Sequence, residues 1–139
     1  MNYSEFLFQL FCNLKALYQK KLNLPGISFQ QMLAIANIDD DGLEMSSLSK
    51  TLGIDNSTGT RLIDGLERKG LVVRVRDNLD NRIVKIFLTN RGEKTYNSID
   101  FELEKIGDEI ESQINLKTKE ELVELGISLN WAIIKHLNK

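Results

Sequence analysis

The sequence contains few of the residues that mark several large classes of protein. It has one cysteine, one proline and one histidine among 139 residues. A single cysteine excludes an internal disulfide framework and is typical of the reducing cytoplasm, where we expect this chain to act. No apolar run approaches the roughly 20 residues that a membrane-spanning helix needs. The N-terminus also lacks the pattern of a secretory signal, so we expect no membrane association.

Motifs for catalysis and for cofactor binding are missing as well. His136 has no cysteine or carboxylate around it at metal-ligand spacing, and the sequence shows no glycine-rich phosphate loop and no nucleophile elbow. The acidic run 39–41 lacks the spaced ligands and distal glutamate of a calcium loop, which favours a solvated loop. We therefore expect no enzyme activity, no metal and no cofactor.

Charge is low overall but unevenly distributed. The net charge is −2, with 42% hydrophobic and 27% charged residues, which is the profile of one globular domain. The segment 56–85 holds seven Arg or Lys and four Asp or Glu, a net charge of about +3, whereas 86–139 carries about −3. Positive charge therefore gathers in one segment, at a level that predicts weak binding to nucleic acid unless two chains act together.

The segment 45–92 has the layout of a DNA-binding motif. Two short helical patterns are joined by a tight turn at 52–54, and the second pattern runs from about Asp55 to Gly70. Two strand-like runs, 71–76 and 83–88, then flank a polar loop. The sequence therefore predicts a mainly α fold with a small β-hairpin wing, a winged helix-turn-helix. Its second helix would enter a DNA major groove, with the hairpin beside it.

The second helix of this motif is amphipathic. Its apolar face carries Gly59, Leu62, Ile63 and Leu66. Its polar face carries hydroxyl groups and a guanidinium near the helix start, where a recognition helix meets base edges. The residues that we expect to contact DNA are Ser57, Thr58, Thr60 and Arg61. A solvated polar face of an ordinary helix is the alternative, and the neighbouring elements favour DNA.

The expected hairpin is basic. Along its first strand Leu71, Val73 and Val75 point to one side, and Val72, Arg74 and Arg76 point to the other. Wing contacts to phosphates or to a minor groove are expected from Arg74, Arg76, Arg82 and Lys85. Asp80 would brace Arg82 in an extended position by a charge-assisted bond. The alternative is a weak surface pair that contributes little.

These segments resemble the MarR family of bacterial transcription regulators. The resemblance rests on residues 48–54, 56–72, 80–82 and 88–92. It implies that Asp80 and Arg82 form the family's wing element and that the recognition-helix contacts fall on the four residues given above. Two positions depart from the family pattern. Gly59 replaces a small aliphatic residue, which we expect to let the backbone come closer to its target, and Glu44 replaces a Ser or Thr cap.

The flanking segments are predicted to form a dimer. Apolar residues follow a helical period over 6–18. A narrow apolar stripe follows a helical period over 93–115, and a strongly apolar helix is expected from about Thr118. We expect a DNA-binding lobe at 28–92 and a helical dimerisation region at 1–22 and 93–139, as the resemblance implies. A two-fold homodimer would place two recognition helices about one DNA turn apart on a near-palindromic site. The alternative is that the stripes close only an intramolecular core.

The sequence thus predicts a sequence-specific regulator that binds double-stranded DNA, and a repressor in particular. The resemblance also permits release by a small aromatic or amphipathic effector held between the dimer helices and the DNA-binding lobe. A second hypothesis is peroxide sensing through Cys12, although its aromatic and aliphatic neighbours favour a buried, inert thiol. A third hypothesis is a winged-helix module that binds other proteins.

Overall fold

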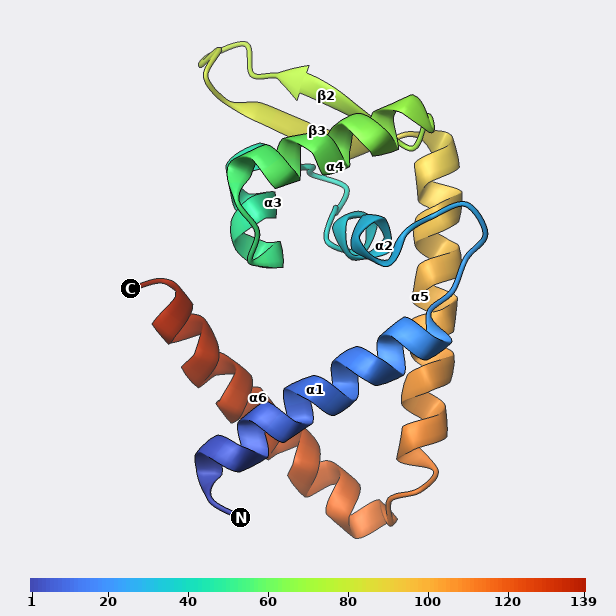
Figure 1. The fold of residues 1–139 in the computed structure, drawn as a ribbon, viewed down its shortest axis with the longest axis vertical. Coiled ribbons are helices and arrows are strands. Elements are labelled where there is room, and N and C mark those ends of the chain that lie inside the picture. The colour runs from blue at the N-terminus through green and yellow to red at the C-terminus, as the bar shows by residue number, and fades with distance from the viewer. The chain divides into compact units, whose positions relative to one another are not determined.

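The computed structural model describes residues 1–139, apart from the side chain of Leu116, in two compact units, 1–103 and 104–139 (Figure 1). The first unit contains α1 (Tyr3–Lys21), α2 (Phe29–Ala36), β1 (Leu43–Glu44), α3 (Met45–Leu52), α4 (Asn56–Arg68), β2 (Val72–Arg76) and β3 (Val84–Leu88). Helix α5 (Asn90–Glu111) begins in the first unit and ends in the second, which also contains α6 (Leu116–Leu137). The predicted fold class, mainly α with a small β-hairpin, is confirmed. None of the helices, among the residues described, is long and apolar enough to cross a membrane.

Short polar signals fix where the first two helices begin. Asn2 caps α1 and Ser28 caps α2, and each forms a capping box with the residue three positions later, Glu5 or Gln31. In such a box two backbone N–H groups that the helix leaves unpaired gain side-chain acceptors. Both helices therefore begin where local hydrogen bonding favours them, and the predicted start of α2 at Ser28 is confirmed to within one residue.

The turn between α3 and α4 depends on a glycine. Gly53 ends α3 with φ of 66°, in the left-handed region that residues with a Cβ rarely adopt. At the other end of α3, Glu44 occupies the cap position and makes no side-chain capping bond in the part of the chain that the structure describes. The structure thus confirms that Glu44 stands at the cap position in place of a Ser or Thr. Packing stabilises α3 instead, with Leu48 and Ser49 buried.

The sheet has three antiparallel strands in the order β1-β3-β2. The hairpin register pairs Arg74 with Ile86 and Val75 with Lys85, and β1 adds a pair between Glu44 and Lys85. The sequence predicted the two hairpin strands but not β1. This strand is only two residues long, and its partner lies about forty residues away, so local pattern carries no signal for it.

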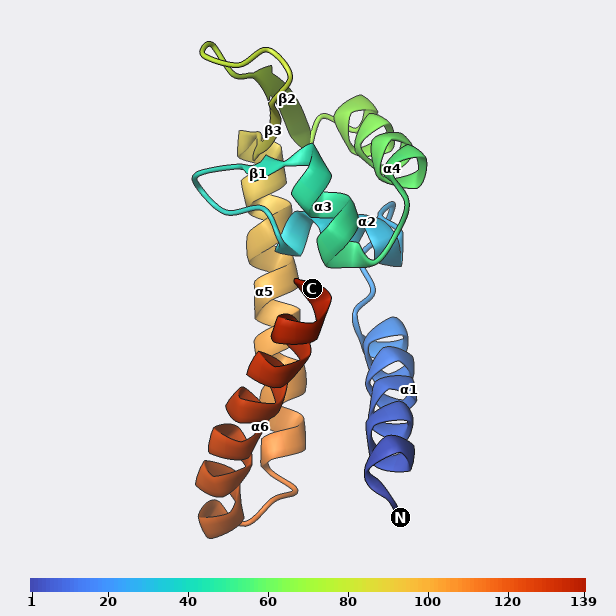
Figure 2. The same cartoon turned by 90° about the vertical axis from the view of Figure 1, so that its left-hand side faces the viewer.

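Helices α2, α3 and α4 gather on one side of the sheet and enclose the core (Figures 1 and 2). The largest fully buried side chains are Ile35, Ile38, Leu48, Ile63, Leu66, Val72, Ile86 and Ile99. They come from α2 and the loop after it, from α3 and α4, from β2 and β3, and from α5. Burying a side chain of this size stabilises the fold by about 1.5–3 kcal/mol, so these residues form the main core of the first unit.

Polar contacts hold the segments just before and just after the β2–β3 hairpin. Lys69, directly after α4, donates from Nζ to the carbonyl of Gly26 and to Oε1 of Gln31, each at 2.6 Å. On the other side, the Thr89 hydroxyl donates to the Gly70 carbonyl at 2.6 Å and accepts from the Gly92 amide at 3.0 Å. The end of α4 is thereby joined to the turn before α2, and the start of α5 is joined to the start of β2.

Candidate nucleic-acid interface

The start of α4 is held in place by Asp55. Its Oδ1 accepts from the Thr58 amide and from the Ser57 hydroxyl, each at 2.7 Å. The Thr58 backbone hydrogen bond, followed by the Ser57 hydroxyl, lowers the pKa of Asp55 to about 2. A carboxylate at this end also interacts favourably with the helix dipole. The first turn of α4, where a recognition helix meets base edges, is therefore a fixed surface.

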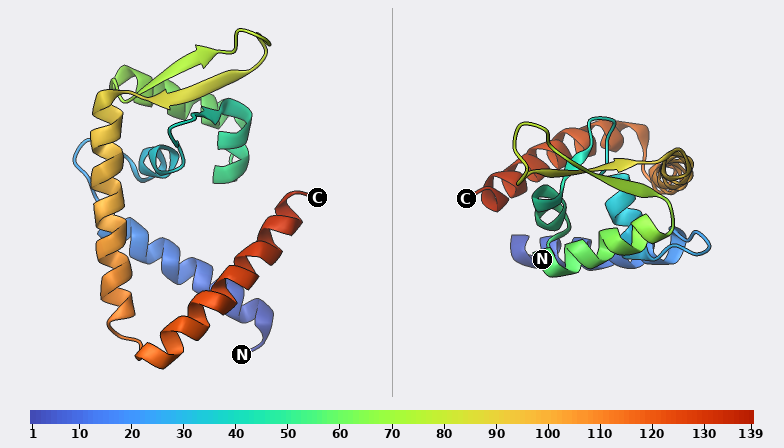
Figure 3. Two further views of the ribbon diagram at one scale, coloured as in Figure 1. Left: turned by 180° about the vertical axis from the view of Figure 1, so that it is seen from behind. Right: turned by 90° about the horizontal axis from the view of Figure 1, so that it is seen from above.

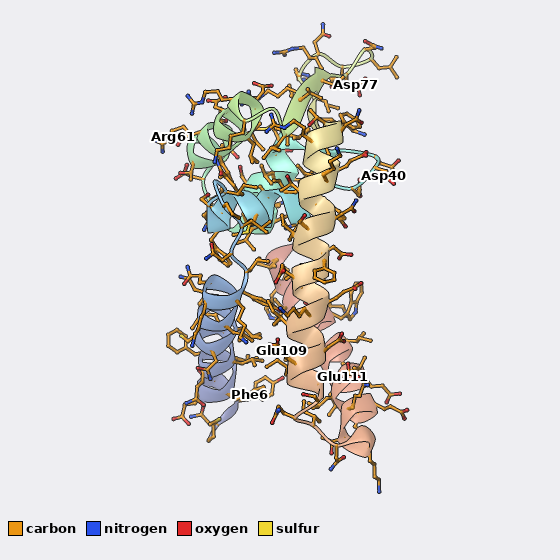
Figure 4. All side chains as sticks on the ribbon, turned by 90° about the vertical axis from the view of Figure 1, so that its right-hand side faces the viewer. Phe6, Asp40, Arg61, Asp77, Glu109 and Glu111 are labelled. Carbon is orange, nitrogen blue, oxygen red and sulfur yellow. The ribbon has the colours of Figure 1, made fainter. Side chains whose placement is uncertain are left out.

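The outer face of α4 carries the residues that the sequence assigned to it. Ser57, Thr60 and Arg61 are exposed and Thr58 is half-buried, whereas Ile63 and Leu66 are buried on the opposite face. The Thr60 hydroxyl donates to the Asn56 carbonyl at 2.9 Å, which fixes its rotamer and leaves its oxygen free to accept. Figure 4 shows Arg61 at the surface of α4. The predicted division of faces is confirmed, and DNA contact by these residues stays a prediction.

Gly59 faces the protein interior, which corrects one expectation. From the sequence alone, this glycine is expected to bring the backbone nearer to the target. Gly59 is instead buried, and a Cβ placed there would collide with Oγ of Ser49 on α3. The glycine therefore lets α3 and α4 pack closely against each other, because at helical spacing it lies on the same face as Ile63.

At the wing tip, Asp80 and Arg82 form a two-pronged ion pair. Arg82 Nε donates to Oδ1 at 3.0 Å and Nη2 donates to Oδ2 at 3.1 Å, while the Arg82 amide also donates to Oδ1. The pair lowers the pKa of Asp80 and raises the pKa of Arg82, in each case chiefly through the bond between the side chains. The Arg82 side chain is 91% exposed. The geometry matches the predicted bracing role, which presents the guanidinium in an extended position.

The basic residues of the hairpin do not share one face. Paired residues of antiparallel strands point to the same side, so Arg74 lies with the buried Ile86, and Lys85 lies with the exposed Val75. Arg76 is on the Arg74 side, and its Nη1 donates to the Asn81 carbonyl at 2.7 Å. The register therefore places Lys85 on the face of the hairpin opposite to Arg74 and Arg76, and DNA contact by Lys85 stays a prediction.

The guanidinium of Arg74 pairs with two acidic side chains of α4. Its Nη2 lies 2.5 Å from Asp64 Oδ1, and its Nη1 lies 2.8 Å from Glu67 Oε1. The side chain is 26% exposed, far less than that of Arg82. The structure thus places this predicted DNA contact in a link between the hairpin and the recognition helix.

A groove of about 430 Å³ runs between the helix-turn-helix and the hairpin. It is lined by Glu44, Met45, Ser46, Ser49, Asn56, Thr60, Arg74, Arg76, Arg82, Ile83 and Val84. Four of the predicted site residues meet here, and Ser57, Thr58, Arg61, Asp80 and Lys85 lie outside the lining. The view from above in Figure 3 shows α4 running alongside the hairpin.

Asn56 lines the groove but is not among the residues that the sequence predicted to contact DNA. It is exposed at the first position of α4, and its backbone carbonyl accepts from Thr60. In the sequence, Asn56 stands among the polar residues at the helix start that can act as caps. An asparagine side-chain amide can pair with adenine. Residue type alone did not single out Asn56 for such a contact, whereas its position on the groove does.

Two further expectations concern residues outside the groove. Cys12 is exposed, so the expectation of a buried thiol is wrong for the single chain. The reason is that α1, as described here, buries none of its own residues. The acidic run 39–41 is a turn in which Asp39 Oδ1 accepts from the Asp41 amide, as a solvated loop would.

Comparisons with known proteins agree with this geometry. A family model described as "MarR family" matches residues 27–84. The HTH-type transcriptional regulator SarZ of Staphylococcus epidermidis is 30% identical over 122 residues, which cover 88% of this chain and 78% of that protein.

Solved structures show the same fold over nearly the whole chain. A MarR transcriptional regulator from Methanosarcina mazei is 28% identical with a TM-score of 0.79, and the match covers 96% of this chain and 98% of that chain. FabT of Streptococcus pneumoniae, solved in complex with DNA, is 26% identical with a TM-score of 0.74, and 96% of each chain is covered.

Proposed function

The chain belongs to the MarR family of transcription regulators, and we propose that it represses transcription by binding a near-palindromic DNA operator as a homodimer. The groove carries the proposal, because Asn56 and Thr60 of α4 and Arg76 and Arg82 of the hairpin all line it. In a winged helix-turn-helix, the recognition helix enters the DNA major groove while the wing contacts neighbouring phosphates or the minor groove. Here α4 forms one wall of the protein groove and the hairpin forms the other. FabT, which is similar in fold and 26% identical, is solved in complex with DNA, and this supports DNA binding by the present chain.

We assign sequence reading to the start of α4. Arg61 is exposed there and has the donor fork that pairs with guanine, while Ser57 and Thr60 present hydroxyls to bases or phosphates. Thr58 lies beside them in the same turn. We assign Arg76, Arg82 and the half-buried Lys85 to the DNA backbone or the minor groove, which adds affinity with little dependence on sequence.

The exposed apolar residues of α1 and α6 support the homodimer. Phe8 and Phe11 on α1 are 70% and 58% exposed, and Leu125 and Trp131 on α6 are 69% and 59% exposed. Apolar surface of this kind on helices is typical of an interface. A net charge of only about +3 over 56–85 also requires two lobes for useful affinity.

The test begins with selection of bound duplexes from a random DNA pool. We expect a near-palindromic consensus with two chains per duplex in sedimentation experiments. Arg61→Ala should weaken binding to that operator by about 1–3 kcal/mol and change binding to random DNA little. Arg82→Ala should weaken binding to both and lower the slope of affinity against salt by about one per protomer.

Lys94→Ala, which removes a positive charge from α5, is the control and should leave both measurements unchanged. Failure to enrich any sequence would contradict the proposal. Absence of any salt-dependent binding to random DNA would instead favour the protein-interaction module.

The exposed thiol of Cys12 supports a second candidate, a peroxide-sensitive regulator. In this case peroxide should release the wild-type protein from its operator, and Cys12→Ser should stay bound. Equal release of both proteins would exclude Cys12 as the sensor. Control by a small aromatic or amphipathic effector stays a prediction, and a change in operator affinity on addition of such compounds would test it.

A further inference from the structure

One guanidinium joins the hairpin to three successive turns of the recognition helix. Arg74 contacts Asp64 and Glu67 through its two terminal nitrogens, and Nη2 also donates to the Thr60 carbonyl at 3.3 Å. We name this set of contacts the Arg74 clamp. Its acceptors, at positions 60, 64 and 67, follow the helical period, so they form one face of α4 directed at β2.

The clamp holds two separate reading surfaces at a fixed spacing. A guanidinium is planar and presents its donors in a rigid fork, so contacts on several helical turns fix both the distance and the direction of α4 relative to β2. Thr60 is a groove residue of α4, and Arg76 follows two residues after Arg74 on the same strand. A change in the clamp would therefore shift both walls of the groove relative to each other.

The surroundings of Arg74 are poorly suited to a phosphate. Two carboxylates already accept from its guanidinium, so the local net charge is about −1, and a phosphate would meet repulsion from both. Arg82 differs because it pairs with one carboxylate and is 91% exposed. Two arginines of the same hairpin thus have different environments.

We infer that Arg74 is a positioning residue that sets the spacing between α4 and the wing through Asp64 and Glu67, and that it does not contact DNA itself. The inference rests on the proposed DNA-binding function. It assigns Asp64 and Glu67, two acidic residues on a DNA-reading lobe, a role in supporting DNA binding.

The decisive variant is Asp64→Asn, tested by fluorescence anisotropy on the selected operator. If Asp64 only repels phosphates, removal of its charge should strengthen binding. The clamp predicts the opposite, a loss of operator affinity of about tenfold, with less change on random DNA. Asp100→Asn, which removes the same charge from α5, is the matched control and should leave affinity unchanged.

Arg74→Gln provides the second measurement. We expect a similar loss of operator affinity with an unchanged slope against salt, because no phosphate contact is removed. The double variant with Asp64→Asn should be no weaker than the weaker single variant, since both break the same link. Arg74→Lys should restore binding only in part, because an ammonium group lacks the planar fork.

The outcomes separate the inference from the proposed function. If the wild-type protein enriches no operator, the proposed function fails. If it enriches one but Asp64→Asn binds it as tightly or more tightly, or Arg74→Gln lowers the salt slope by about one per protomer, the inference is overturned and the function stands. Thermal unfolding establishes that each variant is folded. Should Arg74→Gln unfold, Glu67→Gln takes its place, since that carboxylate is 41% exposed, and unchanged operator affinity would overturn the inference.

Discussion

Apolar residues are buried in the segment 28–92, which holds the candidate DNA-reading lobe, and are exposed on the flanking helices α1 and α6. In the lobe, Ile35, Leu48 and Ile63 are 0% exposed, whereas Phe8 of α1 and Leu125 of α6 are about 70% exposed. The lobe completes its core within one chain. The flanking helices leave apolar surface exposed, and this is the surface that the proposed homodimer would cover.

The largest effect expected from this contrast comes from the core. Ile63→Ala should destabilise the lobe by about 2–5 kcal/mol, because it opens a cavity among fully buried side chains. Ile127→Ala on α6, where the side chain is 65% exposed, should leave the unfolding midpoint of dilute protein unchanged. It should instead weaken self-association in sedimentation experiments over a range of concentrations. Equal losses of stability from both variants would remove the contrast.

Two glycines of α5 give the next comparison. A Cβ at Gly92 would collide with the Leu71 carbonyl, whereas at Gly107 a Cβ would meet nothing within 4 Å. Gly92→Ala should therefore cost about 1–3 kcal/mol, since backbone must move to admit the methyl group. Gly107→Ala should stabilise the helix by up to about 1 kcal/mol. Chemical denaturation measures both, and a tolerated Gly92→Ala would show that the joint at the start of α5 is loose.

A smaller effect is expected where α3 meets α4. Gly59→Ala should cost about 1 kcal/mol, the lower end for overpacking, because the atom in its way belongs to the Ser49 side chain and not to backbone. Ser49→Ala removes that oxygen and should restore stability in the double variant. If Gly59→Ala weakens operator binding without loss of stability, the glycine acts on DNA after all.

The smallest effect concerns Asp55. Its pKa falls from 3.8 to about 2 on folding, so its contribution to stability is present above pH 3.8 and is lost as the pH falls toward 2. Asp55→Asn keeps the cap acceptor and should remove this pH dependence while changing the unfolding midpoint at pH 7 only slightly. Thermal unfolding at pH 7 and pH 3 measures the difference. An unchanged pH dependence in Asp55→Asn would assign it to other carboxylates.

Most of the candidate site was visible in the sequence because its signals are short-range. The capping groups, the apolar face of α4 and the Asp80–Arg82 pair all lie within a few residues of their partners. Hydrogen bonds and helical period act over such distances, so residue order alone determined these features. The wing pair in particular needs only a tight loop.

Tertiary structure decided what depended on distant partners. The face of Lys85 followed from the hairpin register, and the role of Gly59 followed from Ser49 on another helix. The sequence correctly predicted that Arg74 points to the same side of its strand as Val72 and Arg76. It did not show the carboxylate partners of Arg74, because they belong to α4. Local pattern determines the direction in which a side chain leaves its own element. The group that it meets is set by how the elements pack, because the same outward direction leads to water, to DNA or to a neighbouring helix.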